Sequence, residues 1–232
     1  MKKTIENSVL YLLTASLLAA GSVALRAADL PAVHYQAQPT NTSVTIKGTS
    51  TFHDWEMIGP SIGGFLEVPA GVSFDTNQAT LPGLKDGVLP ASGRASILVR
   101  TIHSQVEHLP DVMDGLMQTA MKQTNFSAIV YKVGELKLQQ PHAAGQPFTF
   151  DAKGELAIAG VTNKVDFPVT IVPLDKTKIK ISGTTKLKMS DYKVEPPAPN
   201  ILGLGLMKCG YEVIILFDWT LMQQTTTPAA KP

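Results

Sequence analysis

FTFDAKGELAIAGVTNKVDFPVTI, the stretch from Phe148 to Ile171, contains two runs in which apolar and polar residues alternate. Phe148 and Phe150 begin the first run, and Phe167 belongs to the second. Alternation places one set of side chains on a buried face of a strand and the other set toward water. Between the runs, GVTN at 160–163 has the composition of a turn. The stretch therefore predicts a hairpin of two long strands, which are more typical of a barrel or a large sandwich than of a small sheet.

The rest of the chain after residue 42 repeats this pattern. Alternating runs predict further strands at 43–47, 49–57, 62–68, 94–102, 126–133, 134–138, 176–189 and 211–221. Long connections are expected at 69–93, with a short strand at 78–81, and at 190–210. Because the strands follow one another without crossover helices, an antiparallel barrel or sandwich is favoured over an α/β fold.

One helix is expected, from residue 110 or 111 to residue 122. Its apolar residues recur at spacings of three and four, which is the stripe of an amphipathic helix: Met113, Leu116, Met117, Ala120 and Met121. Thioether side chains adapt to varied apolar shapes, so the methionines could contact a ligand. The same stripe could equally do no more than pack on the sheet.

The first 28 residues have the organisation of a secretory signal peptide. Lys2 and Lys3 precede an apolar run at 9–20, and small residues offer cleavage near 24–28. An uncleaved membrane anchor is the alternative, although the run is short for a span of ~20 residues. We therefore expect a periplasmic or secreted protein with one domain at 29–222 and a disordered polar tail at 223–232. Cys209 is the only cysteine, so no intrachain disulfide can form.

Composition and motifs exclude several classes of function. The net charge is +1 and only 17% of residues are charged, so the basic face of a nucleic-acid-binding protein is missing. The sequence contains neither a nucleophile elbow nor a phosphate-binding glycine loop. His103, Glu107 and His108 do not match the spacing of zinc ligands. No enzymatic activity, cofactor or metal is expected.

Four stretches taken together resemble the YceI-like family of secreted, lipocalin-like proteins that bind polyisoprenoids. They are GTSTFHDWE at 48–56, RASILVRTIHSQ at 94–105 followed by the helix and NFSAIVYKV, GELAIAGVTNKVDFPVTI at 154–171, and GTTKLKMSDYKVEPP at 183–197. Their order agrees over residues 43–221. The chain departs from the family before His108, where an Arg-Asp pair is absent, and this leaves the head group of a ligand undefined.

The resemblance implies an all-β fold, an antiparallel eight-stranded barrel that is longer than a lipocalin and carries one short helix. It also implies a ligand inside the barrel: a polyisoprenoid, a quinone-like molecule or another amphiphilic long-chain lipid, held for transport, storage or sequestration. Some family members are homodimers, and a transient membrane contact would serve ligand exchange.

Alternation along the strands and the helical stripe select the candidate lining of the barrel: His53, Trp55, Val99, Met113, Met117, Phe167 and Phe217. His53 would either hydrogen-bond a ligand head group or be a satisfied core histidine. The alternative function is an interaction or scaffold barrel whose core is filled by its own side chains and which acts through the loops at 69–93 and 190–210. A cavity too small for an alkyl chain would favour that alternative.

Overall fold

The structure is a computed structural model, and it describes residues 32–140, 142–198 and 208–224. The expected signal peptide and nearly all of the expected tail lie outside these residues. The strands and the α-helix are β1 (Ala32–Ala37), β2 (Ser43–Ser50), β3 (Trp55–Gly59), β4 (Gly63–Pro69), β5 (Val88–Leu89), β6 (Ser92–Leu98), β7 (His103–Ser104), α1 (Pro110–Ala120), β8 (Ala128–Leu138), β9 (Phe148–Ile158), β10 (Val161–Pro173), β11 (Lys178–Lys188) and β12 (Cys209–Gln223).

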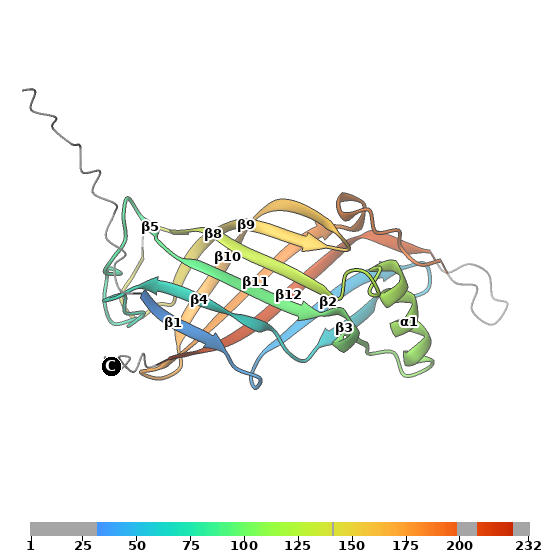
Figure 1. Cartoon of the computed structure of the whole chain (residues 1–232), viewed down its shortest axis with the longest axis horizontal. Helices are drawn as coiled ribbons and strands as arrows, with labels where there is room; N and C mark the ends of the chain where they lie inside the picture. Colours follow the sequence, from blue (N-terminus) through green and yellow to red (C-terminus); the bar gives the residue numbers. More distant parts are fainter. Residues whose placement is uncertain (1–31, 141, 199–207, 225–232) are drawn as a thin grey trace, which may run out of the picture.

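Within the described residues, eight of these strands close into an antiparallel barrel. The order around it is β1-β4-β6-β8-β9-β10-β11-β12, and β12 pairs with β1 to complete the ring. The hairpin that begins at Phe148 lies in the middle of this order, and the whole of β9 pairs with residues 161–171 of β10. The predicted fold class is confirmed, and the molecule is elongated along the strands (Figure 1).

Three further strands form a branch of the sheet at one end of the barrel. β2 pairs with residues 209–218 of β12, β3 with β2, and β7 with β3, whereas β1 pairs with residues 221–223 of β12. β6 pairs with β8, but β7 is the last strand of the branch. α1 lies beside β7 at this end of the barrel (Figure 1). We call this the helix end, and the opposite end the loop end.

The loop end is filled by the connection between β4 and β5. Val72, Phe74 and Leu81 of this connection are buried in the main hydrophobic core. The ring of Phe148 packs edge-on against Phe74, with centroids 6.4 Å apart, and stacks on His142 at 4.2 Å. The connection therefore closes the barrel with packed side chains.

Several element boundaries differ from those predicted by alternation. The expected strand at 49–57 is interrupted at 51–54, and Gly48 lies within β2. The expected strand at 94–102 ends at Leu98, where a 3-10 turn at Val99–Thr101 begins. The two strands predicted around Gly134 are one strand, β8, with a register shift between Val133 and Glu135. No strand forms at 78–81; β5 follows later.

The helix is confirmed where the stripe predicted it. Pro110 occupies the first turn, where its missing N–H would have had no partner, and Asp111 lies near the positive end of the helix dipole. Leu109, which precedes the helix, has a left-handed conformation with φ 57°. Across the described ranges, no helix has the length and apolar character needed to cross a bilayer.

Candidate functional site

The barrel encloses two adjoining cavities. The cavity at the helix end, here the outer compartment, lies between α1, β3 and the first residues of β12 and has a volume of about 120 Å³. The inner compartment lies among β4, β6 and β8 to β12 and has a volume of about 130 Å³. Five apolar residues line both: Ile46, Ile129, Ile158, Leu187 and Ile215. The two compartments therefore meet at a shared apolar junction.

The lining is apolar because each strand turns its alternate residues inward. On β11, for example, Ile181, Thr185 and Leu187 face the cavities, whereas Thr184 and Lys186 between them are exposed. The indole of Trp219 does not offer a free donor, since its Nε1 donates a hydrogen bond to the carbonyl of Ile62 at 3.1 Å. Such a lining binds hydrocarbon by burial, which contributes about 0.8 kcal/mol per CH₂.

Two inward-facing glycines keep the inner compartment open. A Cβ at Gly154 would lie 2.6 Å from Cζ and Oη of Tyr131, and a Cβ at Gly183 would lie 2.6 Å from Cζ of Phe217. Each aromatic ring therefore lies against the wall, over a position without a side chain. Both strands would be crowded at these points by any other residue.

The aromatic rings of this region form a connected band. Tyr131 and Phe167 have centroids 5.2 Å apart, and Phe167 meets Phe217 edge-on at 6.0 Å. The band joins β8, β10 and β12 across the inner compartment. Edge-on and tilted contacts of this kind stabilise aromatic pairs beyond the area they bury.

The hydroxyl of Tyr131 is a polar atom packed behind this apolar lining, with no surface in the cavity. It is buried, and no other described residue forms a hydrogen bond with it. Burial, with a smaller contribution from the charge of Asp166, raises the pKa of Tyr131 to about 12. The hydroxyl therefore stays protonated, and leaving it unpaired costs on the order of 1–3 kcal/mol.

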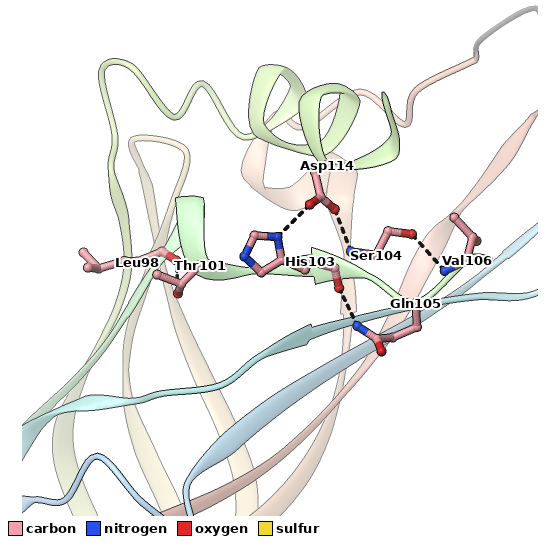
Figure 2. Close-up of polar contacts among 7 residues, drawn as sticks. All are labelled: Leu98, Thr101, His103, Ser104, Gln105, Val106 and Asp114. Atoms are coloured by element: carbon pink, nitrogen blue, oxygen red, sulfur yellow. Dashed lines mark hydrogen bonds and ion pairs between the residues drawn. The ribbon is translucent and has the colours of Figure 1, made fainter. Parts of the chain in front are cut away.

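α1 forms one wall of the outer compartment. Met113, Leu116 and Met117 face the cavity from this helix. The helix is held on β7 by Asp114, whose Oδ1 accepts a hydrogen bond from the backbone N–H of Ser104 at 2.6 Å and whose Oδ2 lies 2.7 Å from Nδ1 of His103 (Figure 2). Asp114 is buried although it is charged, so these contacts are what make its position favourable.

Five of the predicted lining residues reach the cavities. Trp55, Met113 and Met117 line the outer compartment, and Phe167 and Phe217 line the inner one. The alternation along β10 and β12 and the helical stripe placed these side chains on the correct faces.

His53 and Val99, also expected in the lining, line neither compartment. His53 lies exposed in the loop that interrupts the predicted strand, where the hydroxyl of Ser50 donates to the carbonyl of His53 and the His53 Nδ1 hydrogen-bonds the carbonyl of Asp54. Val99 is buried, but it begins the 3-10 turn after β6 and lines neither compartment. In both places a turn breaks the period of two.

The cysteine and the two histidines near the helix end form no reactive or metal-binding site within the described residues. Burial raises the pKa of the Cys209 thiol at the outer compartment, which disfavours its reactive thiolate form. His103 pairs with Asp114, and His108 is exposed. Where the chain is described, no three His, Cys, Asp or Glu residues are grouped as a metal would require.

Sequence reasoning missed the residues that shape the cavities most. Tyr131 follows Ile129 at inward spacing in the run before Gly134, so alternation could have found it. Gly154 and Gly183 interrupt otherwise regular strands, and such glycines mark the close approach of another group. The role of Asp114 could not be predicted from the sequence, because it depends on β7 lying beside the helix.

Comparison with known proteins identifies the family. A model of the YceI-like domain matches residues 35–221, which is most of the chain. This chain belongs to the YceI-like family. A search of curated proteins found no match.

Two solved structures share the YceI-like barrel seen here. BcnA from Burkholderia cenocepacia aligns with a TM-score of 0.54 and 14% identity, over 79% of this chain and 98% of BcnA. A polyisoprenoid-binding domain from Saccharophagus degradans, implicated in plant cell wall breakdown, aligns with a TM-score of 0.56 and 14% identity, over 82% of this chain and 98% of that domain. At this identity the likeness shows a common fold.

Proposed function

We propose that this protein binds a polyisoprenoid, quinone-like or other long-chain lipid inside its barrel, and that it acts by binding rather than by catalysis. The observation that carries the proposal is the pair of apolar compartments that meet at Ile46, Ile129, Ile158, Leu187 and Ile215. A hydrocarbon chain that spans both would be buried along its length, and each CH₂ would add about 0.8 kcal/mol. Membership of the YceI-like family and the polyisoprenoid-binding neighbour support the choice of ligand.

The volume of the compartments bears on the alternative of a scaffold barrel filled by its own side chains. That alternative required an interior too small for an alkyl chain. Two adjoining cavities of about 120 and 130 Å³ with apolar linings instead support an interior that its own side chains do not fill.

A role in transport, storage or sequestration outside the cytoplasm completes the proposal. The basic and apolar pattern of residues 1–28 supports export to the periplasm or beyond. Transient contact with a membrane would let the lipid enter through the helix end. In the described part of the chain, the exposed large apolar residues at or near this end support that route: Phe52, Leu98, Leu109, Val112, Phe126, Tyr211 and Ile214.

Native mass spectrometry of the purified mature protein tests the proposal. The spectra are recorded as purified, after extraction with organic solvent, and after incubation with a long-chain prenol. A lipid adduct that is lost on extraction and regained on incubation supports the function, whereas a chain that neither carries nor takes up lipid contradicts it. The same spectra report whether the protein forms the homodimer that some YceI-like proteins form.

A further inference from the structure

The two compartments offer no place for the polar head group of a lipid. Their linings expose only apolar atoms, and the one charged residue that borders them within the described residues, Lys188, is itself exposed to solvent. Burying a polar group without a hydrogen-bond partner is unfavourable. A bound amphiphile must therefore place its head group outside the compartments, and the wall of the barrel determines where this can happen.

The wall is split between β10 and β11 in the half of the barrel nearer the helix end. These two strands pair with each other only as far as Val169 and Gly183. Beyond that point, residues 161–168 of β10 pair with β9 alone, and residues 184–188 of β11 pair with β12 alone. Pro168, the first residue of β10 beyond the shared ladder, has no N–H with which to continue it. The backbones of the two strands therefore leave a gap in the wall.

Side chains, rather than backbone hydrogen bonds, close this split. A recess of about 430 Å³ opens to solvent there, and its lining includes Val165 of β10 and Thr185 and Leu187 of β11. Thr185 also lines the inner compartment, and Leu187 lines both compartments. At the helix end, the split is bridged by the side-chain amide of Asn163, which donates a hydrogen bond to the carbonyl of Asp191 at 2.8 Å. The recess and the interior are therefore separated by side chains that border both.

The rim of the recess is polar, unlike the compartments. Its charged residues are exposed: Lys164, Asp166, Lys186, Lys188 and Asp191. Among the described residues, Lys164 and Lys186 form no ion pair. Their ammonium groups are free to donate hydrogen bonds, and the aspartates balance much of their charge. The rim therefore suits a head group whose oxygens accept hydrogen bonds, whether or not that group carries a charge.

We propose that a bound lipid emerges sideways through this split, with its hydrocarbon in the compartments and an oxygen-bearing head group in the recess, where Lys164 and Lys186 donate hydrogen bonds to it. This inference rests on the proposed function and assigns the position of the polar end of the same ligand. The chain passes between Val165 and Leu187 by rotation of side chains, and no hydrogen bond of the ladder between β10 and β11 has to break.

Fluorescence quenching locates the head group directly. In a Cys209→Ala background, a coumarin is attached to Thr184→Cys at the split, to Lys180→Cys on the paired part of β11, or to Thr119→Cys on α1. The probe is a palmitoyl amide that carries a nitroxide, a short-range quencher, on its head group. Quenching should be strongest for the label at residue 184. Quenching that is no stronger there than at the other two positions would overturn the inference.

Removal of the two lysines measures their contribution to affinity. Lys164→Met combined with Lys186→Met should weaken binding of geranylgeraniol and of geranylgeranyl phosphate about 2- to 5-fold, the range of exposed polar contacts, and leave binding of the parent hydrocarbon unchanged. Lys178→Met combined with Lys180→Met makes the same change of charge where β10 and β11 are paired, and it should alter no affinity. Equal losses in the two double variants would attribute the effect to net charge and overturn the inference.

The failures are distinguishable. A protein that takes up none of these lipids contradicts the proposed function and the inference with it. A protein that takes up the head-labelled amide but shows its strongest quenching at residue 119, beside α1, contradicts the inference alone. A stearate with the nitroxide at the far end of its chain is the matched probe and should quench the label at residue 184 less than the head-labelled amide does. Equal quenching by the two probes would mean that lipid lies along the outer surface, which also overturns the inference.

Discussion

The two ends of the barrel are closed in different ways. At the loop end, the connection after β4 buries Val72, Phe74 and Leu81 against the ring of Phe148, so closure depends on interlocked apolar side chains. At the helix end, α1 turns methionines toward a cavity and is held on β7 by the carboxylate of Asp114 (Figure 2). The loop end of the barrel is thus closed by a packed core, whereas the helix end is closed by a helix that a few polar contacts attach.

The difference indicates where a ligand can enter. Packed side chains at the loop end can move only at a large cost in free energy, because protein cores are as dense as crystals of small molecules. Methionines that face a cavity can adjust their rotamers as its contents change. We therefore expect exchange of lipid at the helix end, and four predictions test the comparison in order of decreasing effect.

The largest effect on stability is expected at the loop end. Phe148→Ala should lower the free energy of unfolding by about 3–5 kcal/mol, because it leaves a cavity among fully buried side chains. Urea denaturation measures the change, and Phe52→Ala, at an exposed phenylalanine, should stay within about 0.5 kcal/mol. A loss below about 1 kcal/mol at Phe148 would mean that packing does not fix this end.

The junction between the compartments gives the next effect. Ile129→Trp should block passage and weaken binding of a long prenol about 100-fold, since exclusion of about four CH₂ groups removes ~3 kcal/mol. A short-chain lipid should be affected much less. Val130→Trp, on the outer face of the same strand, is the matched control and should leave both affinities unchanged. Equal binding of the long prenol by Ile129→Trp would show that lipid does not cross the junction.

The wall at the helix end should respond to loss of its anchor. Asp114→Ala leaves the buried N–H of Ser104 unpaired and should cost about 1–3 kcal/mol. Most of this should appear as faster hydrogen exchange in α1 and faster release of lipid. Asp111→Ala, at an exposed acid in the same helix, should cost about 0.3–1 kcal/mol. If the two substitutions accelerate exchange equally, Asp114 is not the anchor.

The smallest effect concerns Tyr131 and pH. Its pKa is about 12 in the folded protein and 10.0 without the fold, so the neutral form is favoured by folding. The corresponding stability is complete below pH 10 and is lost as pH rises toward 12. Relative to Tyr131→Phe, the wild type should therefore lose about 1 kcal/mol between pH 9 and pH 11. Parallel stability curves for the two proteins would mean that the hydroxyl is solvated.

The regular parts of this fold were predictable from the sequence, because period-two alternation records which face of a strand is buried. The stretch from Phe148 to Ile171 predicted the paired strands β9 and β10, and the methionine spacing predicted α1. Phe167 and Phe217 were placed inward for the same reason.

The irregular parts were not predictable by that rule. A turn at 51–54 exposes His53. A 3-10 turn that begins at Val99 takes the Val99 side chain out of the cavity lining. Gly154 matters because the ring of Tyr131 on the neighbouring strand lies against it. Asp114 matters because Ser104 of β7 lies within hydrogen-bond distance. Such features arise from which strands become neighbours, and local alternation does not encode them.

The central claim is that a single lipid chain occupies both compartments of the barrel. A crystal structure of the mature protein loaded with a long-chain prenol tests it most directly. We expect continuous ligand density from the outer compartment past Ile129 and Leu187 into the inner one. An empty interior, or lipid bound only on the outer surface of the barrel, would contradict it.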